Sequence, residues 1–454
     1  MRVNCNISAI IANNQLGKSE NSVSQAIERL SSGLRINHAK DDASGMAISK
    51  KMHAQIRALE QSSRNTQDGV SVVQTAESAL GEVENMLQRM RELAVQAATD
   101  TNGSEDREAI QLEMDELAKE IDRISTDTEY NTMPLLDGTL SRRAYAKENN
   151  VDVMKVSDTV TSGDYSISVT AAARRAEYSL INVSSIAVEG SVTINGAGFS
   201  VGPEDTADSI YEKFQDACEK INATVEKSGG NIVVRNKEYG KYEELNIKFS
   251  SEAVAAAFTG STAKEITETG TDCTANVGAG FSSTASVSTD GTKITIKDVD
   301  SFEMVIDIEG DTTYADCLVK VTDIGILSIQ AGANEGQQID IDIPEINMHT
   351  LELDFLNVRT SEGAGKAITK LDKAINTVSL VRSKLGAYQN RLETSTESLD
   401  EYNENITAGL SRIEDCDMAE EMTEFTSQNV KNQAATSILA QANERPESIL
   451  QLLQ

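Results

Sequence analysis

The chain is poor in the residues that build large cores and chemical sites. Of its 454 residues, 4% are aromatic, none is tryptophan, 4 are proline and 3 are histidine. No run approaches the roughly 18 consecutive apolar residues of a membrane-spanning helix, so we expect no membrane insertion. The cysteines are odd in number and form no CxxC pair, which indicates no disulfide framework; they are Cys5, Cys218, Cys273, Cys317 and Cys416.

Positive charge is also scarce. The chain has 41 Lys and Arg against 72 Asp and Glu, a formal net charge of −31. Binding to nucleic acid or to an anionic membrane needs a basic face, so neither is an expected partner. The start, MRVNCNISAIIANNQ, lacks the basic region, apolar core and cleavage site of a secretory signal peptide. The composition is typical of a secreted chain, but the usual secretory signal is missing. This mismatch between composition and signal needs an explanation.

Motifs of catalysis and of metal or cofactor binding are missing. His38, His53 and His349 stand in no HExxH pattern, and the sequence has no GxxxxGK[ST] or GxSxG motif. We therefore expect no catalytic residue, no metal and no cofactor. The abundant carboxylates are interpreted as a solvated surface.

A heptad repeat organises the C-terminal third of the chain. Between Ile368 and Ile413 every seventh residue is a large aliphatic: Leu371, Val378, Leu385, Leu392, Leu399, Ile406 and Ile413. This spacing predicts a helix of about 65–70 Å that lies against other helices. The companion row turns polar from Arg382 onward, so the remaining contacts are expected from partners. An ordinary helix of a bundle is the alternative interpretation.

Further helices are predicted at both ends. The first spans residues 4–32 and stops at Gly33, which suits a left-handed cap. A helix from Gly45 to Ala98 and a third helix capped by Ser104 follow. A last helix runs from Met418 to at least Ala442, and Pro446 then restarts the chain as a short apolar turn. The second heptad seam consists of Val73, Ala76, Leu80, Val83, Leu87, Met90 and Ala94. Neither end has enough core alone, so the N- and C-terminal helices are expected to pair.

The middle of the chain changes composition. From Thr139 to Gly325, Gly, Ser, Thr and Val increase, and segments of period two predict strands with glycine turns. These segments begin at Tyr165, Ser191, Asn231, Leu245 and Lys293. One helix is expected at about Asp205 to Ile221, and a hairpin at 327–343. The predicted fold is mostly α, with long antiparallel helices from both termini forming a coiled-coil bundle and a β or α+β outer insertion.

Several segments resemble bacterial flagellins. Residues 26–45, AIERLSSGLRINHAKDDASG, look like the N-terminal signature of that family. The resemblance covers roughly residues 1–138 and 326–454 but not the insertion, of which residues 191–249 resemble the small "IN" module of some flagellins and hook-associated proteins. Other segments that carry it are Gln88–Gln96, Leu385–Arg391, Ser411–Asp415 and Ile438–Asn443.

The resemblance implies a filament subunit. Residues 1–43 and 415–454 would form an inner coiled coil, 44–138 and 326–414 an outer helical tube, and 139–325 a variable surface domain. The implied partners are other copies of the chain, the filament cap and hook-associated proteins, an export chaperone and the type III export apparatus. Export through that apparatus, without a cleaved signal, would resolve the mismatch noted above and place the chain outside the cell.

The resemblance also implies a receptor surface. Flagellins of many bacteria are detected by Toll-like receptor 5, and the family's key arginine, leucine and glutamate correspond to Arg89, Leu93 and Glu113. The alternative is that Arg89 and Glu113 pack only against a neighbouring subunit. Two other functions remain open: a hook–filament junction protein with the same terminal design, and a surface enzyme or adhesin, which would need a site in the insertion.

Overall fold

The computed structural model describes residues 6–148, 150–157, 159–180, 188–228, 231–299, 302–308, 310, 312–322 and 324–452, with side chains to Arg445. The chain divides into two compact units. The first, which we call the terminal unit, comprises Met1–Gln67, Gln330–Gln338 and Glu393–Gln454. The second, the central unit, comprises Asp68–Ile329 and Ile339–Leu392.

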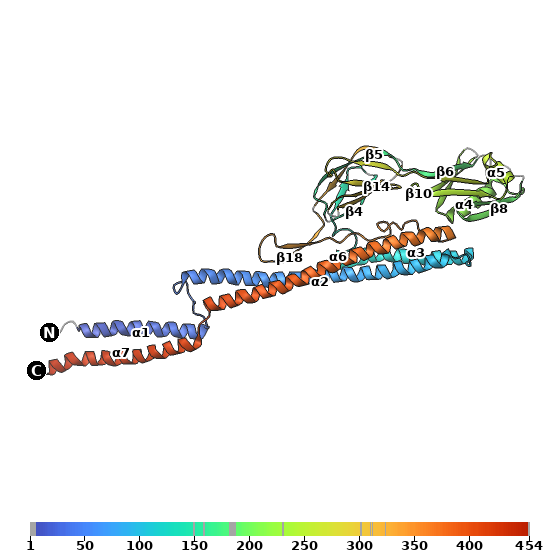
Figure 1. Ribbon diagram of the computed structural model, residues 1–454. Helices are drawn as coiled ribbons and strands as arrows, with labels where there is room; N and C mark the ends of the chain where they lie inside the picture. Colours follow the sequence, from blue (N-terminus) through green and yellow to red (C-terminus); the bar gives the residue numbers. More distant parts are fainter. Residues whose placement is uncertain are drawn as a thin grey trace. The chain divides into compact units, whose positions relative to one another are not determined.

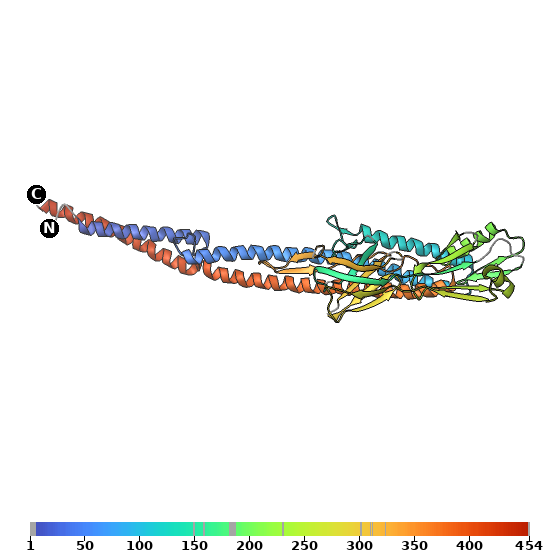
Figure 2. The ribbon, with the colours of Figure 1, turned by 90° about the horizontal axis from the view of Figure 1, so that it is seen from above.

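An antiparallel pair of helices dominates the terminal unit (Figures 1 and 2). Near one end, Asn6 Nδ2 donates a hydrogen bond to the carbonyl of Ala442 over 2.8 Å. Ser19 Oγ donates to the carbonyl of Gln428 over 3.2 Å, so rising numbers in one helix meet falling numbers in the other. The expected pairing of the two ends is confirmed. The helices are α1 (Ile7–Ser32) and α7 (Met418–Leu452).

Local signals at the helix ends behave mostly as predicted. Gly33 has φ 74°, and its N–H donates to the carbonyl of Arg29 over 2.8 Å, as the predicted left-handed cap requires. Asp42 Oδ1 accepts the backbone N–H groups that begin the second helix. The predicted restart at Pro446 is wrong, because α7 continues to Leu452. Proline inside a helix costs about 3 kcal/mol, a cost that the hydrogen bonds of the other turns of α7 must offset.

Three helices frame the central unit: α2 (Ala43–Ala98), α3 (Ser104–Asp127) and α6 (Ser361–Glu414), of which α2 and α6 also extend into the terminal unit. Ion pairs join α2 to α6, for example Arg382 Nε to Glu77 Oε1 at 3.1 Å. The predicted cap of α3, Ser104, is instead its first helical residue. The N-cap is Gly103, whose N–H donates to Asp106 Oδ2 over 3.0 Å, because an acidic side chain one turn on can satisfy this donor.

The rest of the chain is β-rich, and every strand pair with a described register is antiparallel. The alternating segments predicted from the sequence are strands β5, β7, β10, β11 and β15. The strands are β1 (Glu129–Tyr130), β2 (Met133–Pro134), β3 (Ala144–Ala146), β4 (Val151–Val156), β5 (Gly163–Ala171), β6 (Arg175–Leu180), β7 (Gly190–Ile194), β8 (Ala197–Val201), β9 (Ala223–Ser228), β10 (Asn231–Tyr239), β11 (Glu244–Phe249), β12 (Glu265–Thr269), β13 (Thr274–Val277), β14 (Ser286–Asp290), β15 (Lys293–Lys297), β16 (Glu303–Ile308), β17 (Tyr314–Val321), β18 (Leu327–Gln330) and β19 (Gln338–Ile341).

The first β core lies between two four-stranded sheets, β13-β5-β17-β3 and β14-β15-β16-β4. Every second side chain of β16 is buried, which is the alternation that a strand covered on one face requires. The core includes Ile167 and Val319 of one sheet and Ile294 and Ile306 of the other. Apolar residues at period two therefore suffice to build a sandwich of this size.

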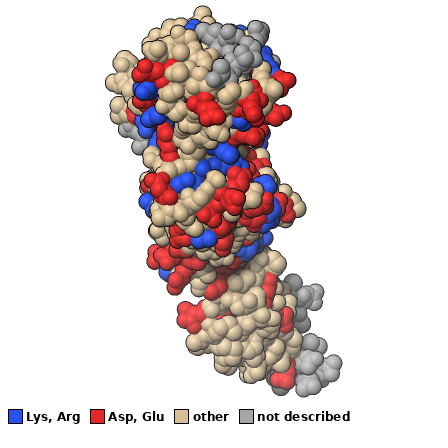
Figure 3. All heavy atoms as spheres, turned by 90° about the vertical axis from the view of Figure 1, so that its right-hand side faces the viewer, with Lys and Arg blue, Asp and Glu red and all other residues tan. Residues whose placement is uncertain are grey.

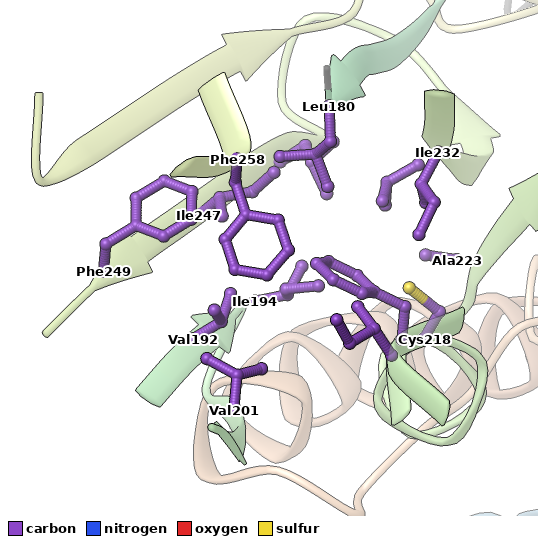
Figure 4. Close-up of a cluster of buried hydrophobic side chains, with 14 of the residues drawn as sticks. Leu180, Val192, Ile194, Val201, Cys218, Ala223, Ile232, Ile247, Phe249 and Phe258 are labelled. Atoms are coloured by element: carbon purple, nitrogen blue, oxygen red, sulfur yellow. The ribbon is translucent and has the colours of Figure 1, made fainter. Parts of the chain in front are cut away.

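The second β core combines strands with two helices (Figure 4). Strands of the sheets β12-β11-β7-β8 and β6-β10-β9 surround it, with α4 (Ala207–Glu219) and α5 (Glu252–Thr259). Thr206 caps α4, and its side chain accepts the N–H of Ser209, so the helix begins close to the prediction. Helix α5 was not predicted. Buried Leu180 and Phe258 belong to this core, which therefore extends beyond residues 191–249.

The long helices and the β-rich middle confirm the predicted fold class. Short strands β18 and β19 pair as the predicted hairpin, whose turn is closed by a hydrogen bond from the N–H of Ala331 to the carbonyl of Gln337 over 2.9 Å. Within the described part of the chain, none of the helices is long and apolar enough to cross a membrane.

Candidate interaction surfaces

The paired terminal helices leave large apolar side chains uncovered. In α1 the buried residues are only Ala12, Ser19 and Ala26. An apolar series along a helix that the chain itself does not cover marks a surface for another partner. The exposed members in α1 are Ile7, Ile10, Ile11 and Ile27, at 51–63% exposure, and those in α7 are Met418, Met422, Val430 and Ile438, at 48–60%.

The predicted heptad positions differ in burial along the chain. In the central unit they are fully buried, at 0% exposure: Val73, Leu80, Leu87, Leu371, Val378, Leu385 and Leu392. In the terminal unit Leu399 is 8% exposed, and Ile406 is only partly buried. The heptad side chains are thus less completely buried toward the end of α6, because fewer side chains of the same chain pack against them there.

The polar companion position Arg382 takes part in an ion-pair cluster. Its guanidinium bonds to Glu77 and Glu84 of α2, and these hydrogen bonds, the one to Glu77 foremost, raise the pKa of Arg382. The side chains of Arg382 and Glu84 are 35% and 18% exposed, so the charges are partly shielded from solvent. A polar residue in a heptad row can fix the register of neighbouring helices, which is the use we assign to Arg382.

Two of the three predicted receptor residues meet on the surface. Arg89 of α2 donates to Glu113 Oε1 of α3 from Nη2 over 2.8 Å and from Nε over 3.0 Å. Their side chains are 50% and 46% exposed. The hydrogen bond to Glu113 is the largest cause of a raised pKa for Arg89. Leu93 is 2% exposed, so the chain itself covers its side chain. Its apolar side chain turns into the core and supports the helix that presents Arg89.

The three histidines lie in three separate side-chain contacts. Each pairs with one carboxylate, at 2.7–2.8 Å: His38 with Glu28, His53 with Glu414, and His349 with Asp354. Among the side chains described, no group of three or more His, Cys, Asp or Glu is placed to hold a metal ion.

The described thiols are poor nucleophiles. Burial raises the pKa of Cys218 to about 12 and that of Cys273 to about 11, and it also raises the pKa of Cys317 and Cys416. Because the thiolate is the reactive form, raised pKa values keep these groups protonated at neutral pH. For Cys416 the neighbouring Glu421 acts in the same direction.

Charge is mixed on the surface of the protein. On the face drawn in Figure 3, acidic side chains predominate and basic ones are interspersed among them, without a continuous basic area. Sequence reasoning did not find one polar cluster, in which Glu238 and Glu243 meet Lys366 and Lys370. Glu243 and Lys366 lie 123 positions apart along the chain, and Glu238 and Lys370 lie 132 positions apart. No local sequence pattern can predict contacts over such separations.

Comparison with known proteins assigns the family. The N-terminal helical region of bacterial flagellin matches residues 3–141, and the C-terminal helical region matches residues 368–453. A flagellin of Clostridium tyrobutyricum is 34% identical over 98% of this chain and 100% of the relative. The chain belongs to the flagellin family. A flagellin of Salmonella typhimurium, 32% identical over 100% of this chain and 99% of its own length, agrees.

Membership of the family makes the chain a structural subunit of the flagellar filament. Solved structures add no argument to this assignment, because their TM-scores are low. FliC from Burkholderia pseudomallei has 18% identity, a TM-score of 0.25, and coverage of 71% of this chain and 99% of its own. Flagellar hook associated protein-3 from Legionella pneumophila has 13% identity, a TM-score of 0.32, and coverage of 80% and 98%.

Proposed function

We propose that this subunit assembles by burying the exposed apolar side chains of α1 and α7 against other copies of the chain. The exposure of Ile11, at 63%, and of its neighbours along the pair carries the proposal. Burying one such side chain is worth roughly 1.5–3 kcal/mol, so several per subunit favour a polymer strongly. Residues 1–43 and 415–454 are then the inner coiled coil, 44–138 and 326–414 the outer tube, and 139–325 the surface.

The subunit's role is structural and not enzymatic. We assign it further partners on the same grounds: the filament cap and hook-associated proteins at the ends of the polymer, and an export chaperone that covers the apolar terminal helices beforehand. Export proceeds through the type III apparatus to the cell exterior, without a cleaved signal peptide. Support comes from the family, together with the uncovered isoleucines, which a chain kept soluble before assembly must protect.

The free subunit is also recognised by Toll-like receptor 5. Arg89 and Glu113 are the contacts, because both are half exposed and held together by two hydrogen bonds. A pre-organised charged pair loses little side-chain freedom on binding and suits an interface. The buried side chain of Leu93 contributes indirectly, because its packing holds α2 in place.

Seeded polymerisation tests the assembly proposal. Purified chain and a truncation lacking residues 415–454 are mixed with short filament fragments and followed by light scattering and electron microscopy. Long filaments from the full chain alone support assembly through the terminal pair. Soluble monomers from both samples would contradict it and favour the hook–filament junction protein.

Receptor recognition is tested with a matched pair of variants. Arg89→Ala removes the charge that we assign to the receptor contact, whereas Arg123→Ala removes a similarly exposed α3 arginine, paired with Glu120 and Asp127. Losing a charged hot-spot residue costs about 2 kcal/mol or more, so binding of the receptor ectodomain should weaken at least thirtyfold for Arg89→Ala only. Equal binding by both variants would exclude this surface.

A further inference from the structure

Two lysine–glutamate pairs join the second β core to the start of α6. Lys370 Nζ lies 2.8 Å from Glu238 Oε1, and Lys366 Nζ lies 3.1 Å from Glu243 Oε2. The glutamates come from the end of β10 and the turn after it, and their side chains are only 17–18% exposed. We call these contacts, together with the asparagine contacts that follow, the polar joint, and residues 175–269 around the second core the module.

Asparagines continue the joint beside the ion pairs. Asn222 Nδ2 donates to the carbonyl of Phe355 over 2.6 Å, and Asn357 Nδ2 donates to Asn222 Oδ1 over 3.2 Å. The segment that receives them is itself fixed to α3, since the N–H of Val358 donates to Gln111 Oε1 over 2.8 Å. The module therefore contacts a firm base through side-chain hydrogen bonds and ion pairs.

The joint is not closely packed. It borders a partly open cavity of about 60 Å³, with polar side chains in its lining, among them Asn195, Asn236, Thr360 and Glu362. A polar space of this size has room for water, which competes for the same hydrogen bonds. Interfaces between folded parts of a chain that are small and polar allow relative motion, whereas large apolar ones do not.

A neck beside the joint is a second attachment of the module within the central unit. Arg174 and Thr271 exchange two backbone hydrogen bonds of 2.9 Å each where the chain enters and leaves the module. Beside them, a Cβ on Gly270 would lie 2.4 Å from the carbonyl oxygen of Gly240. The turn after β10 also belongs to the neck, since the N–H of Lys241 donates to Asp272 Oδ1 over 2.9 Å. The neck thus consists of two chain segments and this turn in close contact, and it is the pivot if the joint separates.

We propose that the module swings on this neck and that the two lysine–glutamate pairs act as a salt-sensitive latch that holds it against α6. Closing the latch takes Glu238 and Glu243 largely out of water, and the lysines compensate that loss of hydration. Without the lysines the buried carboxylates favour the open state, in which they are hydrated. Salt weakens the latch because the charges are partly exposed and therefore screened.

Zero-length cross-linking of the monomeric full chain tests the latch. A carbodiimide couples an amine to a carboxylate only when the two are in contact, and mass spectrometry identifies the joined peptides. Lys155 and Glu303, 2.6 Å apart on paired strands β4 and β16, provide an internal control of similar exposure. At low salt, we expect cross-links at Glu238–Lys370, Glu243–Lys366 and the control.

At about 1 M salt, where the Debye length is about 3 Å, the two cross-links of the joint should fall at least about fivefold, and the control should change less than about twofold. The proposal is overturned if the control couples at low salt and the joint does not. It is also overturned if the joint and the control respond to salt alike.

A pair of variants separates swinging from unfolding. Lys366→Met combined with Lys370→Met removes the latch, and Lys155→Met is the control. Backbone hydrogen exchange in residues 354–360 should accelerate about tenfold in the double variant, while β11, in the middle of the module, keeps its protection. Unchanged exchange at 354–360 would contradict the latch, and so would lost protection in β11, because the module would then unfold and not swing.

Discussion

The second β core and the α1–α7 pair use similar apolar residues with opposite results. In the core, Phe214 and Phe258 are 0% exposed, and the ring of Phe214 lies 4.8 Å from that of Phe199 and 5.7 Å from that of Phe258. In α1, Ile11 is 63% exposed. Strands and helices cover the first set from several sides, whereas one neighbouring helix covers only part of the second.

The difference separates self-sufficient stability from stability that depends on assembly. A layered core buries its apolar area when the single chain folds, so its contribution is present in the monomer. A lone antiparallel pair of helices has no second layer, and its outward side chains are covered only when other subunits arrive. Changes in the two regions should therefore affect different measurements.

The largest expected effect comes from the core. Phe214→Ala removes a fully buried ring and should lower the free energy of unfolding of the module by about 3–5 kcal/mol, because a cavity remains. Urea unfolding of the monomer, followed by circular dichroism, measures the loss. Tyr242→Ala, at a site that is 68% exposed, should stay within about 0.5 kcal/mol. Seeded filament growth should persist in both variants. Its loss in Phe214→Ala would contradict the separation between core stability and assembly.

The terminal pair should show the reverse. Ile11→Asp places a charge on the surface that assembly buries, so we expect the critical concentration for polymerisation to rise at least about tenfold, equivalent to about 1.4 kcal/mol. Val299→Asp, at a site of the β-rich insertion that is 65% exposed, is the matched control and should leave that concentration unchanged. Sedimentation of the polymer at several protein concentrations gives both values. Equal critical concentrations would mean that α1 remains exposed in the filament.

Glycines sharpen the same contrast. A Cβ on Gly270 would lie 2.4 Å and 2.6 Å from two backbone oxygens, so Gly270→Ala should destabilise the neck by about 1–3 kcal/mol. Gly17 in α1 has nothing within 4 Å of such a Cβ. Gly17→Ala should stabilise the helix by up to about 1 kcal/mol. Thermal unfolding of the monomers measures both variants. Destabilisation by Gly17→Ala would contradict the open space that the structure shows around Gly17.

The smallest effect concerns pH. Burial, followed by the charges of Asp152 and Asp137, raises the pKa of Glu345 above the usual 4.5. A carboxyl group with a raised folded-state pKa favours the folded state at low pH, and this contribution is lost as pH rises through the folded-state pKa.

Glu345→Gln should therefore raise the unfolding free energy at pH 7, by less than about 1 kcal/mol because the group is only half buried, and the gain should disappear near pH 4. Unfolding curves across that range measure it. Glu420→Gln, at an exposed position of α7, is the control. A gain that persists unchanged at pH 4 would show that ionisation of Glu345 is not the cause.

Local patterns predicted much of the fold. The heptads located α6 and α2, Gly33 identified a helix end, and period-two segments located strands of both β cores. Helix α5 was not predicted, because its eight residues, EAVAAAFT, are too few and too uniformly apolar to show a helical period. The cap of α3 and the continuation through Pro446 were mispredicted, because neighbouring side chains and the rest of a helix can outweigh one residue's preference.

The candidate surface was predicted in part. Alignment of short motifs with the family placed Arg89 and Glu113 in one site, and the structure brings them to 2.8 Å. The same motif could not show that Leu93 faces inward. Burial depends on which helix covers that side of α2, and this is decided by packing between segments distant in the sequence.

The sequence by itself determined the periods: seven in the helices, two in the strands, and with them the fold class and the family. These follow from backbone geometry, which repeats over neighbouring residues. Only the tertiary structure decided which apolar rows stay exposed and which distant charges meet, as Glu238 and Lys370 do at 2.8 Å. Such contacts depend on how helices and sheets that are distant in the sequence pack against one another, and the spacing of residues along the chain does not determine this packing.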